Sequence, residues 1–206
     1  MSTDGQEIEA KFYVQNIHRI KNHLEELDAH LIQERVLETN IRFDLPDASL
    51  RAEGRVLRLR RDTEIRLTYK GASKNEQGIL SHEEIEFRVE DFEKAKQFLE
   101  ALGYQKLVYY EKYRTTYKLN STFIMLDELP YGNFVEIEGE NIEAIRMLAQ
   151  QLHLNLNNAI ATSYHVLFDR ARTALDLSFR DISFANFADV VVGSTALKVQ
   201  AADDST

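Results

Sequence analysis

The chain contains no cysteine, which excludes disulfide bonds, thiolate nucleophiles and cysteine-bound zinc. Only oxygen and imidazole groups remain as probable kinds of metal ligand. Its 206 residues include only two prolines and eight glycines, which argues against collagen-like and low-complexity chains. No apolar run approaches the ~18 residues of a membrane span, and the beginning of the sequence has no apolar signal core. We therefore expect a globular, cytoplasmic protein with no membrane partner.

Positive charge is also scarce. The 25 Lys and Arg residues are outnumbered by 34 Asp and Glu residues, which gives a formal net charge of −9. A broad basic surface is thereby excluded, so we expect no DNA partner. An anionic ligand would have to be bound by a local cluster of basic residues. The length predicts one domain with a modest appendage.

Hydrophobic spacing predicts a mixture of strands and helices, an α+β fold. Strands are expected near residues 7–14, 37–44, 55–61, 64–70, 80–89, 107–119, 122–126 and 133–139. Helices are expected over residues 17–31 with Asn16 as N-cap, after Asp91 as the cap of the second, from Asn141, which opens the third, and over residues 163–175. Residues 71–78 are expected to form a turn.

The pattern weakens after residue 170, so we divide the chain into a domain of residues 1–170 and a C-terminal extension of residues 171–206. The extension is expected to be partly helical and disordered at its polar end. Its aromatic residues need a surface to cover them, either on the domain or on a second subunit. A homodimer is therefore a prediction.

A short repeat suggests two related halves. The run EIEAK from Glu7 to Lys11 precedes the first helix, and EIEFR from Glu84 to Arg88 precedes the second, at an offset of 77 residues. Two halves of this kind would close one antiparallel barrel about a pseudo-twofold axis.

The predicted strands carry ionisable residues on one face and apolar residues on the other, because residues two apart point the same way. The ionisable faces comprise Glu7, Glu9 and Lys11; Arg58 and Arg60; Arg66 and Lys70; His82, Glu84, Glu86 and Arg88; Lys112 and Arg114; and Glu136 and Glu138. A single strand of this type is typical of a half-exposed sheet with its charged face in water. Six such strands favour the alternative, a closed barrel with its charged faces inside and its apolar faces under the helices.

Such an interior would need cations among its carboxylates. Neighbouring carboxylates on one strand face lie ~7 Å apart and repel by ~2 kcal/mol at an effective dielectric constant of ~20. The Lys and Arg side chains supply part of the positive charge, and a cluster of carboxylate oxygens also suits Mg²⁺ or Mn²⁺. A ligand that bridges such metals and the basic side chains is a polyphosphate.

These residues resemble the signature of the CYTH superfamily, the triphosphate tunnel metalloenzymes, which include class IV adenylyl cyclases and thiamine, inorganic and RNA triphosphatases. Beyond Glu7-x-Glu9-x-Lys11, the similar motifs follow in the family's order over residues 6–170. They are Leu57-Arg58-Leu59-Arg60, Leu67-Thr68-Tyr69-Lys70, Glu84-x-Glu86, Glu111-Lys112-x-Arg114, Leu126-Asp127, Gly132-x-Phe134-x-Glu136-x-Glu138 and Ser163-Tyr164.

The resemblance implies a closed eight-stranded antiparallel β-barrel with flanking helices, and it implies roles for particular residues. Lys11, Arg58, Arg60, Lys70, Lys112 and Arg114 would bind phosphate oxygens. Glu7, Glu9, Asp127, Glu136 and Glu138 would hold Mg²⁺ or Mn²⁺ or position the attacking water, with Glu7, Glu9 and Lys11 at the catalytic centre. His82 stands where many relatives carry arginine, so a structural histidine is expected there. Ser163 and Tyr164 could help to close the barrel or cap the last helix, and the cap is preferred.

Two reactions remain open. A triphosphatase would hydrolyse tripolyphosphate, thiamine triphosphate or ATP by attack of water on the terminal phosphoryl group. A class IV adenylyl cyclase would convert ATP to cyclic AMP and pyrophosphate. Both Glu136 and Glu138 are present, which favours the hydrolase, whereas the segments of residues 41–44 and 111–114 look most like the cyclase and thiamine triphosphatase branch. A non-catalytic module that binds polyphosphate or nucleotide is the third alternative.

Overall fold

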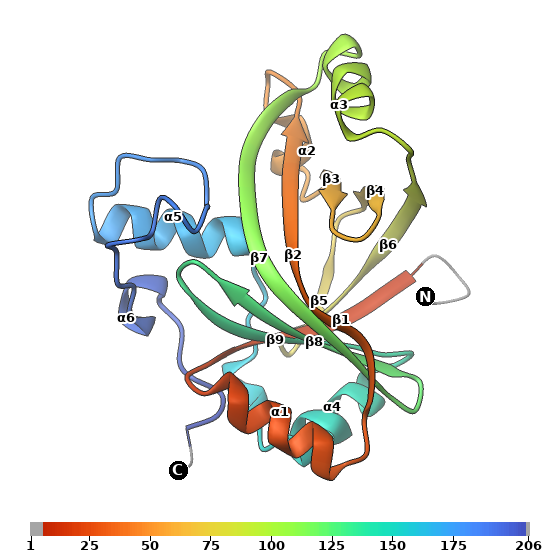
Figure 1. The fold of residues 1–206 in the computed structure, drawn as a ribbon, viewed down its shortest axis with the longest axis vertical. Helices are drawn as coiled ribbons and strands as arrows, with labels where there is room; N and C mark the ends of the chain where they lie inside the picture. The colour runs from red at the N-terminus through yellow and green to blue at the C-terminus, as the bar shows by residue number, and fades with distance from the viewer. Residues whose placement is uncertain (1–5, 205–206) are drawn as a thin grey trace.

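The computed structural model describes residues 6–204, which form a barrel with helices around it (Figure 1). The strands are β1 (Gln6–Val14), β2 (His30–Asp44), β3 (Val56–Arg61), β4 (Ile65–Lys70), β5 (Lys74–Glu76), β6 (Ile79–Arg88), β7 (Gln105–Leu119), β8 (Thr122–Leu129) and β9 (Gly132–Glu138). The helices are α1 (Ile17–Glu26), α2 (Ser49–Ala52), α3 (Phe92–Ala101), α4 (Ile142–Gln151), the 3₁₀ turn η1 (Leu156–Asn158), α5 (Tyr164–Ala174) and α6 (Ser194–Leu197).

Eight strands close the barrel. Neighbouring strands pair in the order β1, β9, β8, β7, β2, β3, β4, β6, and β6 pairs with β1 to complete the ring. Every pair in this ring is antiparallel. The short strand β5 pairs with the beginning of β6. The predicted α+β fold with a closed eight-stranded barrel is confirmed.

Apart from the short helix α2 between β2 and β3, the same order of elements occurs twice along the chain. A strand, a helix and three strands (β1, α1, β2, β3, β4) are followed by a second set (β6, α3, β7, β8, β9). The two repeat strands β1 and β6 are antiparallel neighbours, with Glu7 opposite His82. The arrangement agrees with the short sequence repeat.

The apolar strand faces lie outside the ring, where helices cover most of them, although Ile85 and Phe87 of β6 stay exposed. Around β1, β8 and β9, the residues Phe12, Ile124 and Ile137 are buried in one cluster with residues of α1 and α4. In Figure 1 these two helices lie below the three strands, and α3 lies at the opposite end of the molecule. A second cluster buries Leu59 of β3 against Leu99 of α3. This inside-out pattern leaves the charged faces to line the interior.

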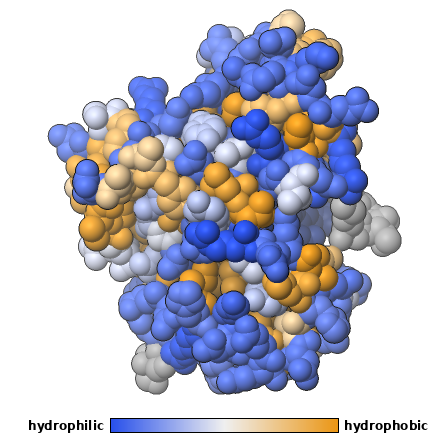
Figure 2. Space-filling view, viewed as in Figure 1, coloured by the Kyte–Doolittle hydropathy of each residue, from blue (hydrophilic) through white to orange (hydrophobic). Residues whose placement is uncertain are grey.

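The C-terminal extension packs on the barrel of its own chain. Ile182 forms backbone hydrogen bonds with Tyr109 and Glu111 of β7 and is fully buried. Phe187 is buried against the rings of Phe168 and Tyr131. Since this chain itself covers the late aromatic residues, they no longer give a reason for a dimer. Figure 2 shows a mostly hydrophilic face, with apolar side chains gathered at the left over the extension and α5.

Three local expectations were wrong. The helix expected over residues 17–31 ends at Glu26, because Asp28 adopts a left-handed conformation (φ 55°) and β2 begins at His30. Strand β5 was missed because its three residues are all exposed and show no apolar alternation. Disorder was expected for the last residues, yet Ala201–Asp203 are buried, and residues 205 and 206 lie outside the described part of the chain.

None of the helices in residues 6–204 is long and apolar enough to cross a bilayer.

Candidate functional site

The barrel encloses a cavity of about 840 Å³ whose lining is dominated by charged side chains. Ten of the eleven predicted site residues line it: Glu7, Glu9, Lys11, Arg58, Arg60, Lys70, Lys112, Arg114, Glu136 and Glu138. They come from β1, β3, β4, β7 and β9, strands far apart in the sequence. The charged faces therefore look toward one another across an enclosed space, and the alternative of a half-exposed sheet is wrong.

One group of ion pairs links β1, β7 and β9. Lys11 Nζ lies 3.2 Å from Glu136 Oε1, and Arg114 also forms an ion pair with Glu136. Burial by itself raises the pKa of Glu136, but Lys11, Lys112 and Arg114 outweigh it and hold that pKa well below its usual range. Glu136 is therefore ionised, and it fixes two of the predicted phosphate-binding cations at the cavity wall.

Asp127, the eleventh predicted residue, lies behind this wall and is fully buried. Its carboxylate accepts hydrogen bonds from Lys112 Nζ at 2.8 Å, Arg114 Nε at 2.6 Å and the Tyr164 hydroxyl at 2.9 Å. Because these donors already occupy both oxygens, the carboxylate is poorly placed to ligate a metal. Its position indicates instead that it holds Lys112 and Arg114 in place.

A second group of ion pairs links β2, β3 and β6. Arg60 lies 3.3 Å from Glu86 and 3.7 Å from Glu38, and Arg58 lies 3.7 Å from Glu86. Glu38 is buried, and although burial raises its pKa, Lys112 and the surrounding arginines lower it strongly. Glu38 was not among the site residues predicted from the sequence. The alternation of polar residues at positions 38, 40, 42 and 44 of the expected strand was the signal that would have found it.

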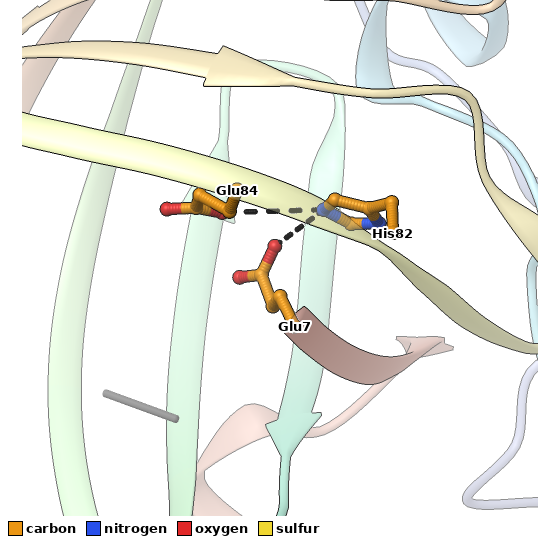
Figure 3. Close-up of side chains that lie close together, drawn as sticks. All are labelled: Glu7, His82 and Glu84. Carbon is orange, nitrogen blue, oxygen red and sulfur yellow. Dashed lines mark ion pairs between the residues drawn. The ribbon is translucent and has the colours of Figure 1, made fainter. Parts of the chain in front are cut away.

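A third group joins β1, β4 and β6. Lys70 forms ion pairs with Glu7 and, at 2.9 Å, with Glu84, while His82 Nε2 lies 2.6 Å from Glu7 (Figure 3). Burial and the neighbouring Glu7 raise the pKa of Glu84 to about 7. Burial disfavours the ammonium of Lys70, but Glu9, Glu7 and Glu84 raise its pKa well above the usual value. His82 thus belongs to the cavity wall.

Glu9 and Glu138 are the two carboxylates of the cavity wall that have no directly paired cation among residues 6–204, although the charge of Lys70 acts on both from farther away. They are directly opposite each other on β1 and β9, and within residues 6–204 neither side chain forms an ion pair or a hydrogen bond. Burial raises the pKa of Glu138, and the carboxylates of Glu7 and Glu9 raise it further. Like charges directly opposite on a sheet are destabilising. The residues present therefore fit a hard divalent cation, which would neutralise this pair.

Several further residues lie at or near the edge of the cavity. Arg88, which shares a strand face with Glu84 and Glu86, is 72% exposed at its side chain and pairs with Glu64, so it takes no part in the cavity. Arg42 was missed by the sequence analysis. It lines the cavity directly opposite Arg58. Ser163 accepts a hydrogen bond from the first turn of α5, as expected of an N-cap, and the neighbouring Tyr164 lines the cavity.

Residues 5–164 match the CYTH domain, and the chain belongs to the CYTH family. A protein of Methanocaldococcus jannaschii named "Putative adenylate cyclase" is 27% identical over 169 residues, which cover 77% of this chain and 95% of that protein.

Solved structures agree on the fold. A Vibrio parahaemolyticus protein described as a "putative adenylate cyclase" superposes with a TM-score of 0.69 at 24% identity, covering 78% of this chain and 97% of that one. A Hippeastrum protein, described as a "putative adenylyl cyclase" with a dominant triphosphatase activity, superposes with a TM-score of 0.59 at 17% identity. The match covers 79% of this chain and 95% of that one. Both likenesses concern the fold alone.

Proposed function

We propose that the protein is a divalent-metal-dependent triphosphatase that hydrolyses an inorganic or organic triphosphate by in-line attack of water on the terminal phosphoryl group. The observation that carries the proposal is the lining of one enclosed cavity. The six predicted Lys and Arg side chains line it, as do Arg42 and other arginines, together with a crowded set of carboxylates. Membership of the CYTH family supports the same reaction class.

The basic residues are proposed to bind the phosphate oxygens: Lys11, Arg58, Arg60, Lys70, Lys112 and Arg114. In the ligand-free protein each is held by a carboxylate, so their positions are set before a substrate enters. Preorganised cations of this kind stabilise the charge that develops in the transition state. Lys11 lies 4.4 Å from the centre of the Tyr164 ring, which fixes its ammonium further.

The carboxylates Glu7, Glu9, Glu136 and Glu138 are proposed to hold the metal, with Mg²⁺ or Mn²⁺ as the ion. When bound, such an ion polarises phosphoryl oxygens and lowers the pKa of a water molecule. Glu9 and Glu138 have free carboxylate oxygens facing the cavity, so they would also orient the attacking water and accept its proton. The bond from the terminal phosphorus to the bridging oxygen breaks, and pyrophosphate or a diphosphate leaves between the basic side chains.

Adenylyl cyclase activity is the second candidate, because the Methanocaldococcus relative carries that name. In this reaction the 3′-hydroxyl of ATP attacks the α-phosphorus, so the nucleoside must lie inside the barrel beside the metal. The cavity also has apolar lining residues, including Val56 and Leu80, that would contact a base. A binding module without turnover is less well supported, since the carboxylates needed for a metal are present.

A substrate panel separates these functions. Tripolyphosphate, thiamine triphosphate, ATP and GTP are each incubated with Mg²⁺ or Mn²⁺, and the products are identified. Metal-dependent orthophosphate supports the hydrolase, cyclic AMP with pyrophosphate supports the cyclase, and binding without products supports the module. A cytoplasmic location and a homodimer both stay predictions. The aromatic residues of the extension no longer support the dimer, because this chain covers them itself.

A further inference from the structure

His82 is an unusual residue in the cavity wall because its ring is buried and its nitrogens are poorly satisfied. The residue is only 5% exposed, and neither Nδ1 nor Nε2 has a partner in hydrogen-bonding geometry within the described residues. Buried polar groups are normally hydrogen-bonded, so each exception needs a physical explanation. Nε2 lies close to the Glu7 carboxylate but out of hydrogen-bonding alignment, so the structural role expected for His82 leaves both ring nitrogens unexplained.

The ring is aimed at two carboxylates. Nε2 lies 2.6 Å from Glu7 Oε2 and 3.9 Å from Glu84 Oε2, and one donor atom from each of the three residues lies within 4.8 Å of the others (Figure 3). Ligands around a divalent ion at ~2.1 Å are separated by about 3.0–3.4 Å. The three donors therefore reach coordinating distances by side-chain shifts of about 1 Å or less.

A cation already occupies the space between the two carboxylates. Lys70 Nζ contacts both Glu7 and Glu84, the latter at 2.9 Å. The Lys70 ammonium takes the place that a metal ion would take. An ammonium has no acceptor for an N–H group and cannot accept a nitrogen lone pair as a metal ion does, so the His82 nitrogens are left without a partner. A metal ion would use all three side chains at once and release Lys70 toward the phosphates.

We propose that Glu7, His82 and Glu84 form a site for a first-row transition-metal ion such as Mn²⁺, Co²⁺ or Zn²⁺, which displaces the Lys70 ammonium. Imidazole is a strong ligand for the later first-row ions such as Zn²⁺, and Co²⁺ and Mn²⁺ accept it more readily than Mg²⁺, which prefers oxygen ligands. His82 therefore gives the barrel a preference that its carboxylates alone do not. The catalytic meaning of the site rests on the proposed function, because Glu7 also belongs to the metal-binding carboxylates there. The binding site itself does not depend on turnover.

The test measures metal binding by the metal-free full-length chain. Co²⁺ and Mg²⁺ are titrated separately into the wild type, His82→Gln and the control His30→Gln, whose histidine is exposed. Binding is followed by calorimetry and by the visible spectrum of Co²⁺. His82→Gln is expected to weaken Co²⁺ binding about tenfold or more and to change Mg²⁺ binding less than about twofold. Co²⁺ affinity equal to that of the wild type in His82→Gln would overturn the proposal.

Two further measurements hold even if His82→Gln fails to fold. Pulsed electron paramagnetic resonance of the wild type with substoichiometric Mn²⁺ is expected to show coupling to an imidazole nitrogen, and its absence would contradict the site. Lys70→Met removes the competing ammonium, so Co²⁺ is expected to bind several-fold more tightly, and weaker binding would overturn the displacement.

The outcome is also separable from that of the proposed function. Co²⁺ binding through His82 without hydrolysis of any triphosphate would remove the triphosphatase and leave the site. Turnover with Mn²⁺ that shows no nitrogen coupling would remove the site and leave the triphosphatase.

Discussion

At the scale of single residues, the interior of this barrel pairs most of its carboxylates with Lys or Arg side chains and leaves one pair of carboxylates without such a partner. Most carboxylates in the wall have a cation within 4 Å, for example Glu136 with Lys11 and Glu86 with Arg60. Glu9 and Glu138 face each other without one among residues 6–204. A divalent cation bound between them would relieve their electrostatic repulsion, so this pair is where loss of charge is expected to have the clearest consequences.

Glu9→Gln is expected to abolish metal-dependent turnover, with a loss of about 100-fold or more, because the amide keeps the shape and removes the charge. The thermal unfolding midpoint is expected to stay at or above that of the wild type, since repulsion with Glu138 is removed. Phosphate release from tripolyphosphate with Mg²⁺ and a melting curve measure both effects. Glu140→Gln, an exposed change two residues beyond the end of β9, the strand that carries Glu138, is the control. Unchanged turnover in Glu9→Gln would remove the metal assignment.

Asp127 is expected to contribute mainly to the stability of the folded protein. Asp127→Asn leaves the buried cations of Lys112 and Arg114 with a neutral partner, and the loss of unfolding free energy is expected to be about 3–5 kcal/mol. Tyr164→Phe removes only one hydroxyl donor to the same carboxylate and is expected to cost about 1 kcal/mol. Urea unfolding compares the two variants. An Asp127→Asn protein of normal stability that no longer binds Mg²⁺ would restore the metal role first expected for this residue.

At the scale of elements, the first helix is tied to the end of the chain. The Asp203 carboxylate accepts hydrogen bonds from the backbone N–H groups of Gln15 at 2.9 Å and Asn16 at 2.8 Å, and Asn16 is the N-cap of α1. Ala202 N–H also donates to the carbonyl of Tyr13 at the end of β1. These bonds order residues that the sequence predicted to be disordered.

Asp203→Ala is expected to lower the unfolding free energy by about 1–2 kcal/mol, because two N–H groups lose their acceptor. Asp204→Ala is the matched control, since Asp204 is exposed and approaches only the Gln15 side chain at 3.4 Å. Guanidinium unfolding of both variants tests the tie. Equal stability of the two proteins would show that the end of the chain does not hold α1.

The elements that the sequence predicted correctly are those with a strong local signal. Asn16, Asp91, Asn141 and Ser163 all cap helices as expected, because each places a side-chain acceptor before an amphipathic run. Hydrophobic spacing gave a wrong helix end where a left-handed backbone conformation terminates the helix. Leu27 and Leu31 continue the helical spacing, but the left-handed Asp28 lies between them and ends the helix.

At the scale of the whole molecule, the barrel has a charged interior and apolar clusters outside it. One cluster depends on the C-terminal extension, whose Ile182 and Leu197 are fully buried. The alternation of residues along the strands predicted that each has one charged and one apolar face. The closed eight-stranded topology was predicted from the resemblance to the CYTH superfamily. The alternation of residues 38–44 could have indicated that Glu38 faces the interior, but its contact with Lys112 and that of Asp127 with Tyr164 depend on the tertiary path and could not be predicted from local sequence.

Phe187→Ala is expected to destabilise the chain by about 3–5 kcal/mol, because the ring packs against Tyr131, Phe168 and Phe179 and leaves a cavity when it is removed. Val191→Ala is the control in the same segment, since Val191 is 92% exposed, and its effect is expected to stay within about 0.5 kcal/mol. Chemical unfolding gives both values. A small effect of Phe187→Ala would mean that the extension is not part of the folded core.

The most direct test of the proposed chemistry is the position of oxygen-18 after hydrolysis of tripolyphosphate in labelled water with Mg²⁺, observed by phosphorus NMR. Attack of water on a terminal phosphorus places the label in orthophosphate and leaves pyrophosphate unlabelled. This is the result we predict for the wild type, and Glu9→Gln is expected to give no labelled product. Label in pyrophosphate, or no metal-dependent hydrolysis at all, would contradict the account.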